Sequence, residues 1–166
     1  MAIRTESFNE GKFLDGKSFS YITSELALAA GADLNLVLCV GNEPAIIRFI
    51  KLTSDADSLS WQVFAGVDHV AGSGVNVPAI KRNSLADTHS IVTLEKGSTI
   101  NSVGLPVFDP ASEVIGQSAA GNRSYIDVDL LTDLFTATAN ICLLLRITNN
   151  DSGPKRVNIN AESYNN

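Results

Sequence analysis

Few residues of the types that build metal or catalytic centres occur in this chain of 166 residues. It contains two cysteines and two histidines, Cys39, Cys142, His69 and His89. A zinc site takes three or four Cys, His or carboxylate ligands, commonly at short spacings, and these four residues show no such spacing. The sequence therefore predicts no metal site, and without a glycine-rich phosphate loop it predicts no cofactor either.

Charge and long apolar runs are also scarce. Charged residues make up 18% of the chain, and the formal net charge is −6. A nucleic-acid or acidic-membrane partner needs a basic surface, so we expect neither. No apolar run approaches the ~20 residues of a membrane span. The opening Met1–Glu6 lacks the basic and apolar regions of a secretory signal, which favours synthesis in a cytosol.

The two cysteines lie 103 positions apart, each within an apolar, strand-like run. In such a setting cysteine commonly acts as a small buried hydrophobic residue. We expect both thiols to be buried and reduced, and a disulfide across the fold is the alternative.

Short polar side chains and alternating patterns dominate what is present. Ser, Thr and Asn account for 41 of the 166 residues, a composition that suits strands and turns. Apolar and polar residues alternate through Asp33–Val40, Leu59–Gly66, Ser124–Leu130, and the pair Ala139–Thr148 and Arg156–Tyr164. A period of two marks strands, and turn residues separate them. The sequence predicts an all-β, antiparallel β-sandwich or jelly roll of eight or nine strands, with a barrel as second choice.

Four segments qualify this prediction. Residues 1–17 keep no period and read as an irregular N-terminal arm, which leaves 18–166 as a single β-sandwich domain. Ser24–Gly31 suits either a strand or a short helix, and Leu131–Phe135 suits one helical turn. Residues 97–121 carry scattered Gly and Pro and are expected to form a long loop.

Candidate catalytic residues are isolated. His69 and His89 both lie in probable loops, and we expect both to be exposed loop histidines. Asp127 and Asp129 share one face of a strand, as a glycosidase pair would, but a solvated outer face is the expected setting. Asp55–Ser58 resembles the start of a calcium loop without its later glycine and glutamate, so an ordinary turn is expected. The sequence therefore predicts a protein that is not an enzyme.

Two ordered patterns resemble small virion proteins of tailed bacteriophages. The first is Trp61–Gly66 followed by Gly72–Ser84, where a strand leads through a glycine-rich segment into the next strand. The second is Leu144–Gly153 followed by Val157–Tyr164, which resembles the closing hairpin of those proteins. The resemblance covers Ala45–Tyr164.

This resemblance implies a non-enzymatic virion structural protein. Its members are β-sandwich head or decoration components, often trimeric, so the expected role is a capsid decoration or cement protein on the phage head exterior. The expected partners are the major capsid protein, other virion proteins and further copies of the chain; the expected location is the virion surface after synthesis in the bacterial host cytoplasm. Apolar residues on the arm and long loop, with one basic pair, are the expected partner interface: Phe8, Phe13, Leu14, Lys81, Arg82, Val107 and Phe108.

Two other functions would each need a particular arrangement of residues. A carbohydrate- or receptor-binding module would need an exposed stacking platform from Trp61, Tyr21, Tyr125 and Tyr164. The alternation of Trp61 with its strand neighbours instead points its ring toward the core. A hydrolase using Asp127 and Asp129 would need a cleft, which no pattern in the sequence indicates.

Overall fold

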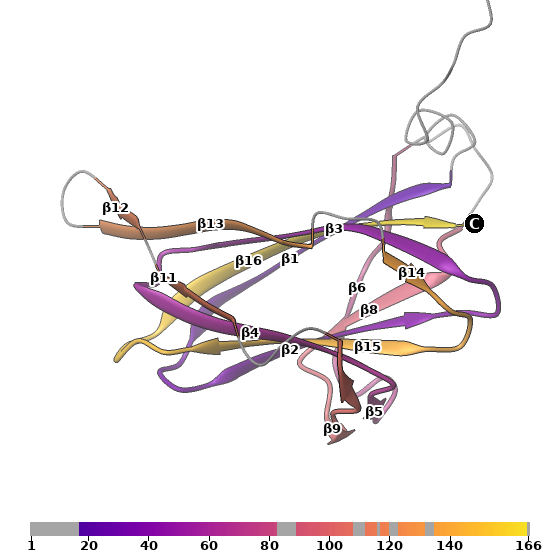
Figure 1. Cartoon of the computed structure of the whole chain (residues 1–166), viewed down its shortest axis with the longest axis horizontal. Coiled ribbons are helices and arrows are strands. Elements are labelled where there is room, and N and C mark those ends of the chain that lie inside the picture. Colours follow the sequence, from indigo (N-terminus) through magenta and orange to yellow (C-terminus); the bar gives the residue numbers. More distant parts are fainter. Residues whose placement is uncertain are drawn as a thin grey trace, which may run out of the picture.

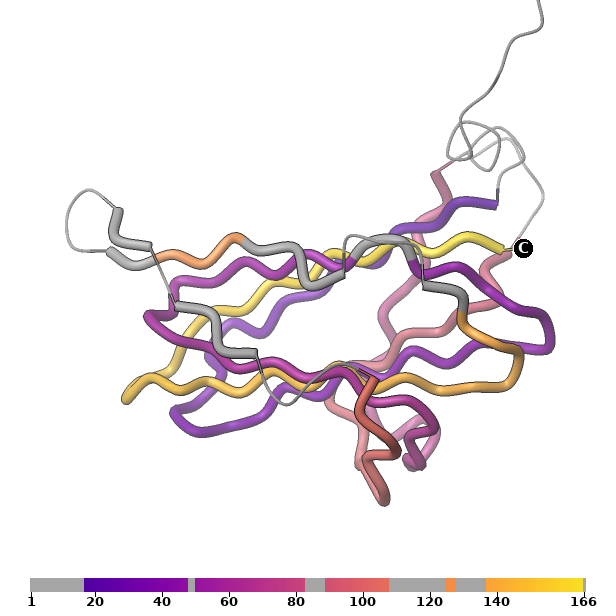
Figure 2. The backbone as a smooth tube through the Cα atoms, in the orientation of Figure 1, coloured from indigo at the N-terminus to yellow at the C-terminus, as the bar shows by residue number. Residues whose placement is uncertain are grey.

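The structure is a computed structural model that describes residues 17–82, 89–107, 112–115, 117–119, 123–131 and 135–165. These residues form two antiparallel β-sheets stacked face to face, with a small two-stranded ribbon outside one of them (Figures 1 and 2). The predicted all-β sandwich is confirmed. Within the described residues, no helix is long and apolar enough to cross a membrane.

The first sheet runs in the order β12-β13-β3-β16-β1-β7, with β14 also paired to β3. Its strands are β1 (Ser18–Leu28), β3 (Ala45–Ser54), β7 (Ile80–Lys81), β12 (Gln117–Ala119), β13 (Arg123–Leu131), β14 (Phe135–Ala137) and β16 (Lys155–Asn165). The long central strands β1, β16 and β3 carry the sheet, and the two-residue β7 leaves most of β1 at an edge.

The second sheet runs in the order β10-β4-β15-β2-β8-β6, with β11 also paired to β4. Its strands are β2 (Asp33–Val40), β4 (Ser58–Ala65), β6 (Val75–Val77), β8 (Val92–Lys96), β10 (Leu105–Pro106), β11 (Ser112–Ile115) and β15 (Cys142–Asn149). The remaining strands, β5 (Asp68–His69) and β9 (Ile100–Ser102), pair with each other and form what we call the β5–β9 ribbon.

The core lies between the two inner faces, because alternate residues of each strand point inward. On β2 and β15 these are the leucines and isoleucines that the alternation predicts. The largest side chains with almost no exposed surface are Tyr21, Tyr164, Phe19, Leu36, Ile47, Leu52, Leu59, Leu94, Leu144, Leu145, Ile147 and Val37. Burial of this apolar surface is the main stabilising contribution to the sandwich.

A second apolar cluster lies on the opposite, outer face of the second sheet. Val37 and Leu144 point away from the sandwich core, yet both are buried. Val67, Ile100 and Val103, which flank or belong to the β5–β9 ribbon, pack over them. Figure 1 shows this ribbon lying outside β2, β4 and β15. The ribbon therefore shields part of the outer face of the second sheet from water.

The structure bears on three segments that qualify the sequence prediction. Ser24–Gly31 is resolved in favour of a strand: β1 continues to Leu28, and the turn that follows contains Gly31 at φ 68°. The expectation of a long loop over 97–121 is wrong for its described part, which carries four short strands, β9 to β12, because each finds an edge or partner strand to pair with. Leu131 ends β13 and Phe135 begins β14, and the centre of the predicted helical turn, residues 132–134, lies outside the described part.

Candidate functional sites

The predicted interface residues do not form one surface in the described structure. Phe8, Phe13, Leu14 and Phe108 lie outside the described residues, as does the predicted arm 1–17 apart from Lys17. Val107 is partly buried and packs against the core, so it contributes to folding. Lys81 lies half-buried in β7, beside β1.

Arg82 is exposed, and its guanidinium makes an ion pair of 2.8 Å with the Glu162 carboxylate on β16. This pair brings β7 and β16 together across β1. The guanidinium of Arg82 is thus already paired to an acid of its own chain.

One edge of β1 is open over most of its length among the described residues. β7 pairs with β1 only at Phe19 and Ser20, so from Tyr21 to Leu28 no described strand lies on that side. The N–H of Arg82 donates to the Ser18 carbonyl, and the Lys96 ammonium donates to the Ser24 carbonyl at 2.8 Å. Even-numbered residues of β1 therefore turn their backbone groups toward this edge.

Exposed apolar side chains accompany this edge. Ile22 is 61% exposed and Leu26 is 68% exposed, both on the outer face of β1. Ile80 of β7, paired with Ser20, is 50% exposed on the same face. We call Ile22, Leu26 and Ile80 the edge strip. A long open strand edge with apolar side chains is a surface on which another chain can pair.

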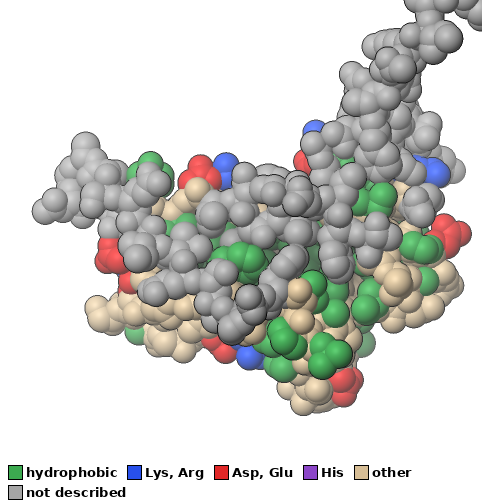
Figure 3. All heavy atoms as spheres, in the orientation of Figure 1, with side chains coloured by type: hydrophobic (Ala, Val, Ile, Leu, Met, Phe, Trp, Pro, Cys, Tyr) green, Lys and Arg blue, Asp and Glu red, His purple; other side chains and the backbone are tan. Residues whose placement is uncertain are grey.

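The remaining outer face of the first sheet is polar along β16 and β3 and carries amides, hydroxyls and paired charges. Asn158 donates a hydrogen bond to the Thr53 hydroxyl across the two strands, and Asn160 lies between Ile22 and Lys51 in register. The charged Lys51 and Glu162 are each in an ion pair, with Asp127 and Arg82. Figure 3 shows the molecule from the side, where charged side chains of the described residues are scattered among neutral and apolar ones. A surface of mixed, paired charges suits close contact with another protein better than binding of a charged polymer.

Of the two aspartates on β13, the structure describes the side chain of Asp127. Asp127 is exposed and makes a 2.8 Å ion pair with Lys51 of the neighbouring β3. Ile126 beside it is buried, so the expected solvated outer face is confirmed for Asp127. The side chain of Asp129 is not among those that the structure describes.

The aromatic platform of a carbohydrate-binding module is not assembled. Tyr21 and Tyr164 are each 1% exposed, while Tyr125 is exposed at the far side of the first sheet. Trp61 is partly buried and packs against the core, as its strand alternation predicts. These four rings therefore cannot stack together on one sugar.

A cavity of about 290 Å³ opens between β1, β6 and β8. Its lining mixes apolar and polar groups and includes Tyr21, Lys81, His89 and Thr93. The Tyr21 hydroxyl donates to the Val92 carbonyl at 2.8 Å and bonds the hydroxyls of Ser90 and Ser163. Burial raises the pKa of Tyr21, and the bonds to Ser163 and Ser90 lower it by a smaller amount.

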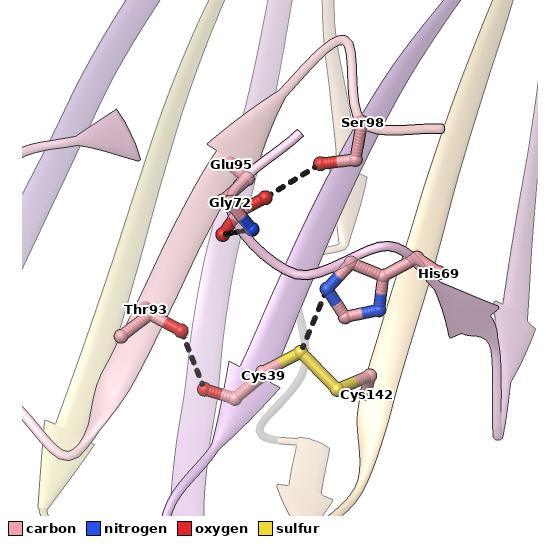
Figure 4. The surroundings of a disulfide bond; sticks show 7 residues. All are labelled: Cys39, His69, Gly72, Thr93, Glu95, Ser98 and Cys142. Atoms are coloured by element: carbon pink, nitrogen blue, oxygen red, sulfur yellow. Dashed lines mark hydrogen bonds between the residues drawn. A yellow bond between two sulfur atoms is a disulfide. The ribbon is translucent and has the colours of Figure 1, made fainter. Parts of the chain in front are cut away.

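A second cluster, whose side chains are of types that react or bind metals, lies under the β5–β9 ribbon. Cys39 of β2 and Cys142 of β15 face each other in register, with their Cα atoms 4.1 Å apart, and form a disulfide. The expectation of buried, reduced thiols is wrong: antiparallel pairing places both sulfurs on one face, and both residues are partly exposed. His69 is also not the predicted exposed loop histidine, because the ribbon holds it over the disulfide, with Nε2 3.9 Å from the Cys39 sulfur (Figure 4). His89 is exposed, as predicted.

Glu95 lies on β8 beside this cluster (Figure 4). Its carboxylate accepts hydrogen bonds from the Gly72 N–H at 3.0 Å and the Ser98 hydroxyl at 2.9 Å. Burial alone raises the pKa of Glu95, but the bonds from Gly72, Ser98 and Gly74, with the nearby His69, outweigh it and leave the pKa below its usual value. Glu95 is thus held as an anion that fastens the glycine turn next to His69.

Sequence spacing misses this cluster because its members come from three separate strands. Cys39, His69 and Cys142 offer ligand atoms that all lie within 4.8 Å of one another. Only strand register and the placement of the ribbon bring them together. The signal available in the sequence is that both cysteines point to the outer face of their strands, opposite the leucine-rich inner face.

Comparison with known proteins assigns no family. No family model and no curated protein matches the chain. Among solved structures, a chain from the IBDV viral particle aligns at 10% identity and a TM-score of 0.23. The alignment covers 90% of this chain and 40% of that chain, so this chain spans well under half of the viral chain's length. A similarity at this TM-score carries no argument about function.

Proposed function

We propose that this chain is a non-enzymatic structural protein of a virus particle, and specifically a decoration or cement protein bound to the exterior of a phage head. The observation that carries the proposal is the open edge of β1 with the exposed Ile22 and Leu26. The sequence resemblance to phage virion proteins supplies the kind of particle. The closed sandwich and the mixed polar outer face of its first sheet, whose charges Lys51 and Glu162 are paired, are compatible with a role in binding.

The proposed contact is strand addition at β1. An extended segment of the capsid protein, with apolar residues at alternate positions, would pair with the backbone groups of β1 from Ile22 onward and would replace the Lys96 ammonium at the Ser24 carbonyl. Its side chains would meet the edge strip of Ile22, Leu26 and Ile80, and the neutral Ser20 and Ser24 beside them. Main-chain hydrogen bonds would give affinity, and the apolar strip would set the register.

A symmetric shell explains why one modest contact is enough. Many copies bound to a lattice gain stability together, so each contact can remain small. The net charge of −6 also repels packaged nucleic acid, which is consistent with an exterior position. Within this proposal the chain is a homo-oligomer, with a trimer favoured by the family it resembles, and sedimentation equilibrium of the purified chain measures its state.

Co-sedimentation tests the docking proposal. Purified phage heads that lack the protein are mixed with the wild-type chain or with Ile22→Lys, which places a charge on the proposed edge. We expect a saturating, stoichiometric number of wild-type copies per head and at least a ten-fold weaker binding of Ile22→Lys.

Leu105→Lys is the matched control for this experiment. Leu105 is 76% exposed on β10 of the other sheet, so its replacement adds the same charge away from β1. Thermal unfolding confirms that both variants fold. Equal binding of Ile22→Lys and wild type would show that β1 is not the docking edge. A wild-type chain that binds no head but gives a signal on a glycan array would favour the receptor-binding alternative.

A further inference from the structure

We propose that Cys39, Cys142 and His69 form a zinc site that is available only when the disulfide is reduced. The two cysteine sulfurs and the His69 Nε2 all lie within 4.8 Å of one another, in a part of the second sheet that is partly exposed (Figure 4). Two thiolates and an imidazole are a ligand set that Zn²⁺ favours. This inference is independent of the proposed docking at β1.

The distance between the histidine nitrogen and one sulfur already fits a tetrahedral zinc ion. Zn–S bonds of about 2.3 Å and Zn–N bonds of about 2.0–2.1 Å place a sulfur and a nitrogen ligand ~3.5 Å apart. The Cys39 sulfur and His69 Nε2 are 3.9 Å apart. The two sulfurs must separate to ~3.7 Å around zinc once the disulfide is broken, which requires both cysteine side chains to rotate about their Cα–Cβ bonds.

The backbone holds the third ligand over the other two. The N–H groups of Gly66 and Val67 donate to the Cys142 carbonyl at 2.9 and 3.2 Å, which ties the approach to β5 directly to β15. The Val70 N–H donates to the Thr99 carbonyl at 2.9 Å, on the far side of His69. His69 is therefore fixed between two backbone anchors that do not depend on the disulfide.

The surroundings favour a cation at this position. The Glu95 carboxylate lies beside the cluster and accepts hydrogen bonds from the Gly72 N–H and the Ser98 hydroxyl, which places an acidic group near the proposed ion (Figure 4). With three protein ligands, water completes the tetrahedron. Val67 and Ile100 of the apolar cluster line the inner side of the ribbon, which limits the access of bulk water to the thiolates.

The chemistry balances in two steps. A dithiol reductant supplies two electrons and two protons, the Cys39–Cys142 bond breaks to give two thiols, and the reductant closes to its own disulfide. Zn²⁺ then binds both sulfurs and Nε2 of neutral His69, and the two thiol protons pass to solvent. In the oxidised chain the sulfurs are bonded to each other and do not serve as thiolate ligands, so the disulfide closes the site.

The test compares the reduced and oxidised chains under anaerobic conditions. A phosphine serves as the reductant of the disulfide: it supplies the same two electrons and becomes its oxide with oxygen from water. The number of zinc ions bound per chain is measured by equilibrium dialysis. In a parallel sample, Co²⁺ replaces zinc as a spectroscopic probe. We expect one metal ion per reduced chain, a thiolate-to-cobalt charge-transfer band, and no such band for the oxidised chain.

Two variants separate this site from incidental metal binding. His69→Ala removes one ligand, and we expect at least a ten-fold weaker zinc affinity in the reduced chain. His89→Ala removes the other histidine, which lies away from the cluster, and we expect an unchanged affinity. Zinc should also raise the thermal midpoint of the reduced wild-type chain, since a ligand of the folded state stabilises it.

Three results would overturn the proposal. Equal zinc binding by the reduced and oxidised chains would show that the thiolates are not ligands. Equal affinity of His69→Ala and wild type would remove the histidine from the site. A reduced chain that loses its β-sheet circular dichroism and does not regain it with zinc would show that the folded chain offers no such site.

Discussion

The carboxylate of Asp151, in the turn between β15 and β16, accepts a hydrogen bond of 2.7 Å from the backbone N–H of Asp57, in the turn between β3 and β4. Its second oxygen accepts from the Ser58 N–H at 3.0 Å, and the Lys155 ammonium lies 3.1 Å away. One side chain thus joins two turns that each connect one sheet to the other at the same end of the sandwich. Hydrogen bonds to an ionised group are about twice as strong as neutral ones.

This arrangement predicts a loss of stability in acid. Burial alone raises the pKa of Asp151, but the bonds from Asp57, Lys155 and Ser58 outweigh it, so the folded-state pKa lies below the usual value. Its stabilisation is therefore fully present above the unfolded pKa of about 3.9 and is lost as the pH falls through the folded pKa. Urea unfolding at a series of pH values measures this, and Asp151→Asn should be about 1–2 kcal/mol less stable at pH 7.

Asp127→Asn is the control for that measurement. Asp127 is exposed and pairs only across the outer face with Lys51, and such surface pairs contribute about 0–1 kcal/mol. If Asp151→Asn retains the acid sensitivity of the wild-type chain between pH 5 and pH 3 (roughly the range of ordinary carboxyl titration), Asp151 is not its source.

The buried side chain of Asn149, at the same end of the molecule, is a second position where we expect a substitution to lower stability. Its side chain has no exposed surface, and its amide nitrogen donates to the carbonyls of Leu28, Ala29 and Gly153 at 2.8–3.2 Å. Its amide oxygen accepts from the Asp151 N–H. Asn149→Ala would remove all of these bonds, of which the one to the Leu28 carbonyl is fully buried, and we expect a loss of about 2–4 kcal/mol in urea unfolding.

The next residue provides the comparison. Asn150 is exposed and bonds only the hydroxyls of Ser58 and Ser60 through its side chain, so Asn150→Ala should lose less than about 1 kcal/mol. A similar loss for both variants would mean that burial of the Asn149 amide does not determine the stability of this turn.

The sandwich itself was predictable because alternation directly reports which face of a strand is buried. Asp33–Val40 is predicted with the bounds that the structure shows for β2. The short strands β9 to β12 were not predictable, since two- to four-residue strands carry too few alternations and depend on a neighbouring edge. The segment Ser24–Gly31 suits either a strand or a short helix because its composition is alanine-rich; pairing of β1 with β16 decides it as a strand to Leu28.

The disulfide needed strand register, which the sequence alone does not fix. Opposite residues on the outer faces of β2 and β15 match one another: Asn35 with Arg146, Val37 with Leu144, and Cys39 with Cys142. The Arg146 guanidinium indeed donates to the Asn35 amide oxygen at 3.1 Å. Once the two strands are known to be neighbours, this complementarity is sufficient to predict the pairing. Nothing in the local sequence places His69 above it.

We expect removal of the disulfide to lower the free energy of unfolding without unfolding the protein. The bond links residues 103 positions apart, and cross-links of this kind typically contribute about 2–4 kcal/mol, chiefly by restricting the unfolded chain. Cys39→Ala with Cys142→Ala should lower the free energy of unfolding by that amount in the absence of reductant. Reductant should lower the wild-type value similarly and leave the double variant unchanged; an effect of reductant on the variant would point to another cause.

Because the pKa of Tyr21 is shifted in the folded chain, we expect the stability of the protein to change at alkaline pH. Its folded pKa is raised above the usual value by burial, so its contribution to stability is fully present below the unfolded pKa of about 10 and is lost as the pH rises through the folded pKa. Tyr21→Phe removes the bonds to the Val92 carbonyl and two serine hydroxyls and should cost about 1–2 kcal/mol at pH 7. Its alkaline unfolding should begin at higher pH than in the wild type, which tyrosinate absorbance and circular dichroism measure together; an identical onset would remove Tyr21 as the cause.

Gly104 fixes the return of the chain from the β5–β9 ribbon to β10. Its φ is 78°, and a Cβ at this position would overlap the backbone carbonyl oxygen of Ala65 and approach the backbone of Gly66. Because backbone atoms cannot move aside as a flexible side chain can, Gly104→Ala combines a steric clash with an unfavourable conformation, and we expect a loss of about 2–4 kcal/mol. Gly153→Ala is the matched control, since a Cβ there meets no atom within 4 Å; it should change stability by less than about 0.5 kcal/mol. If urea unfolding shows equal effects for the two variants, the close approach of Gly104 to β4 does not constrain the ribbon, and His69 is positioned by the hydrogen bonds of Gly66, Val67 and Val70 alone.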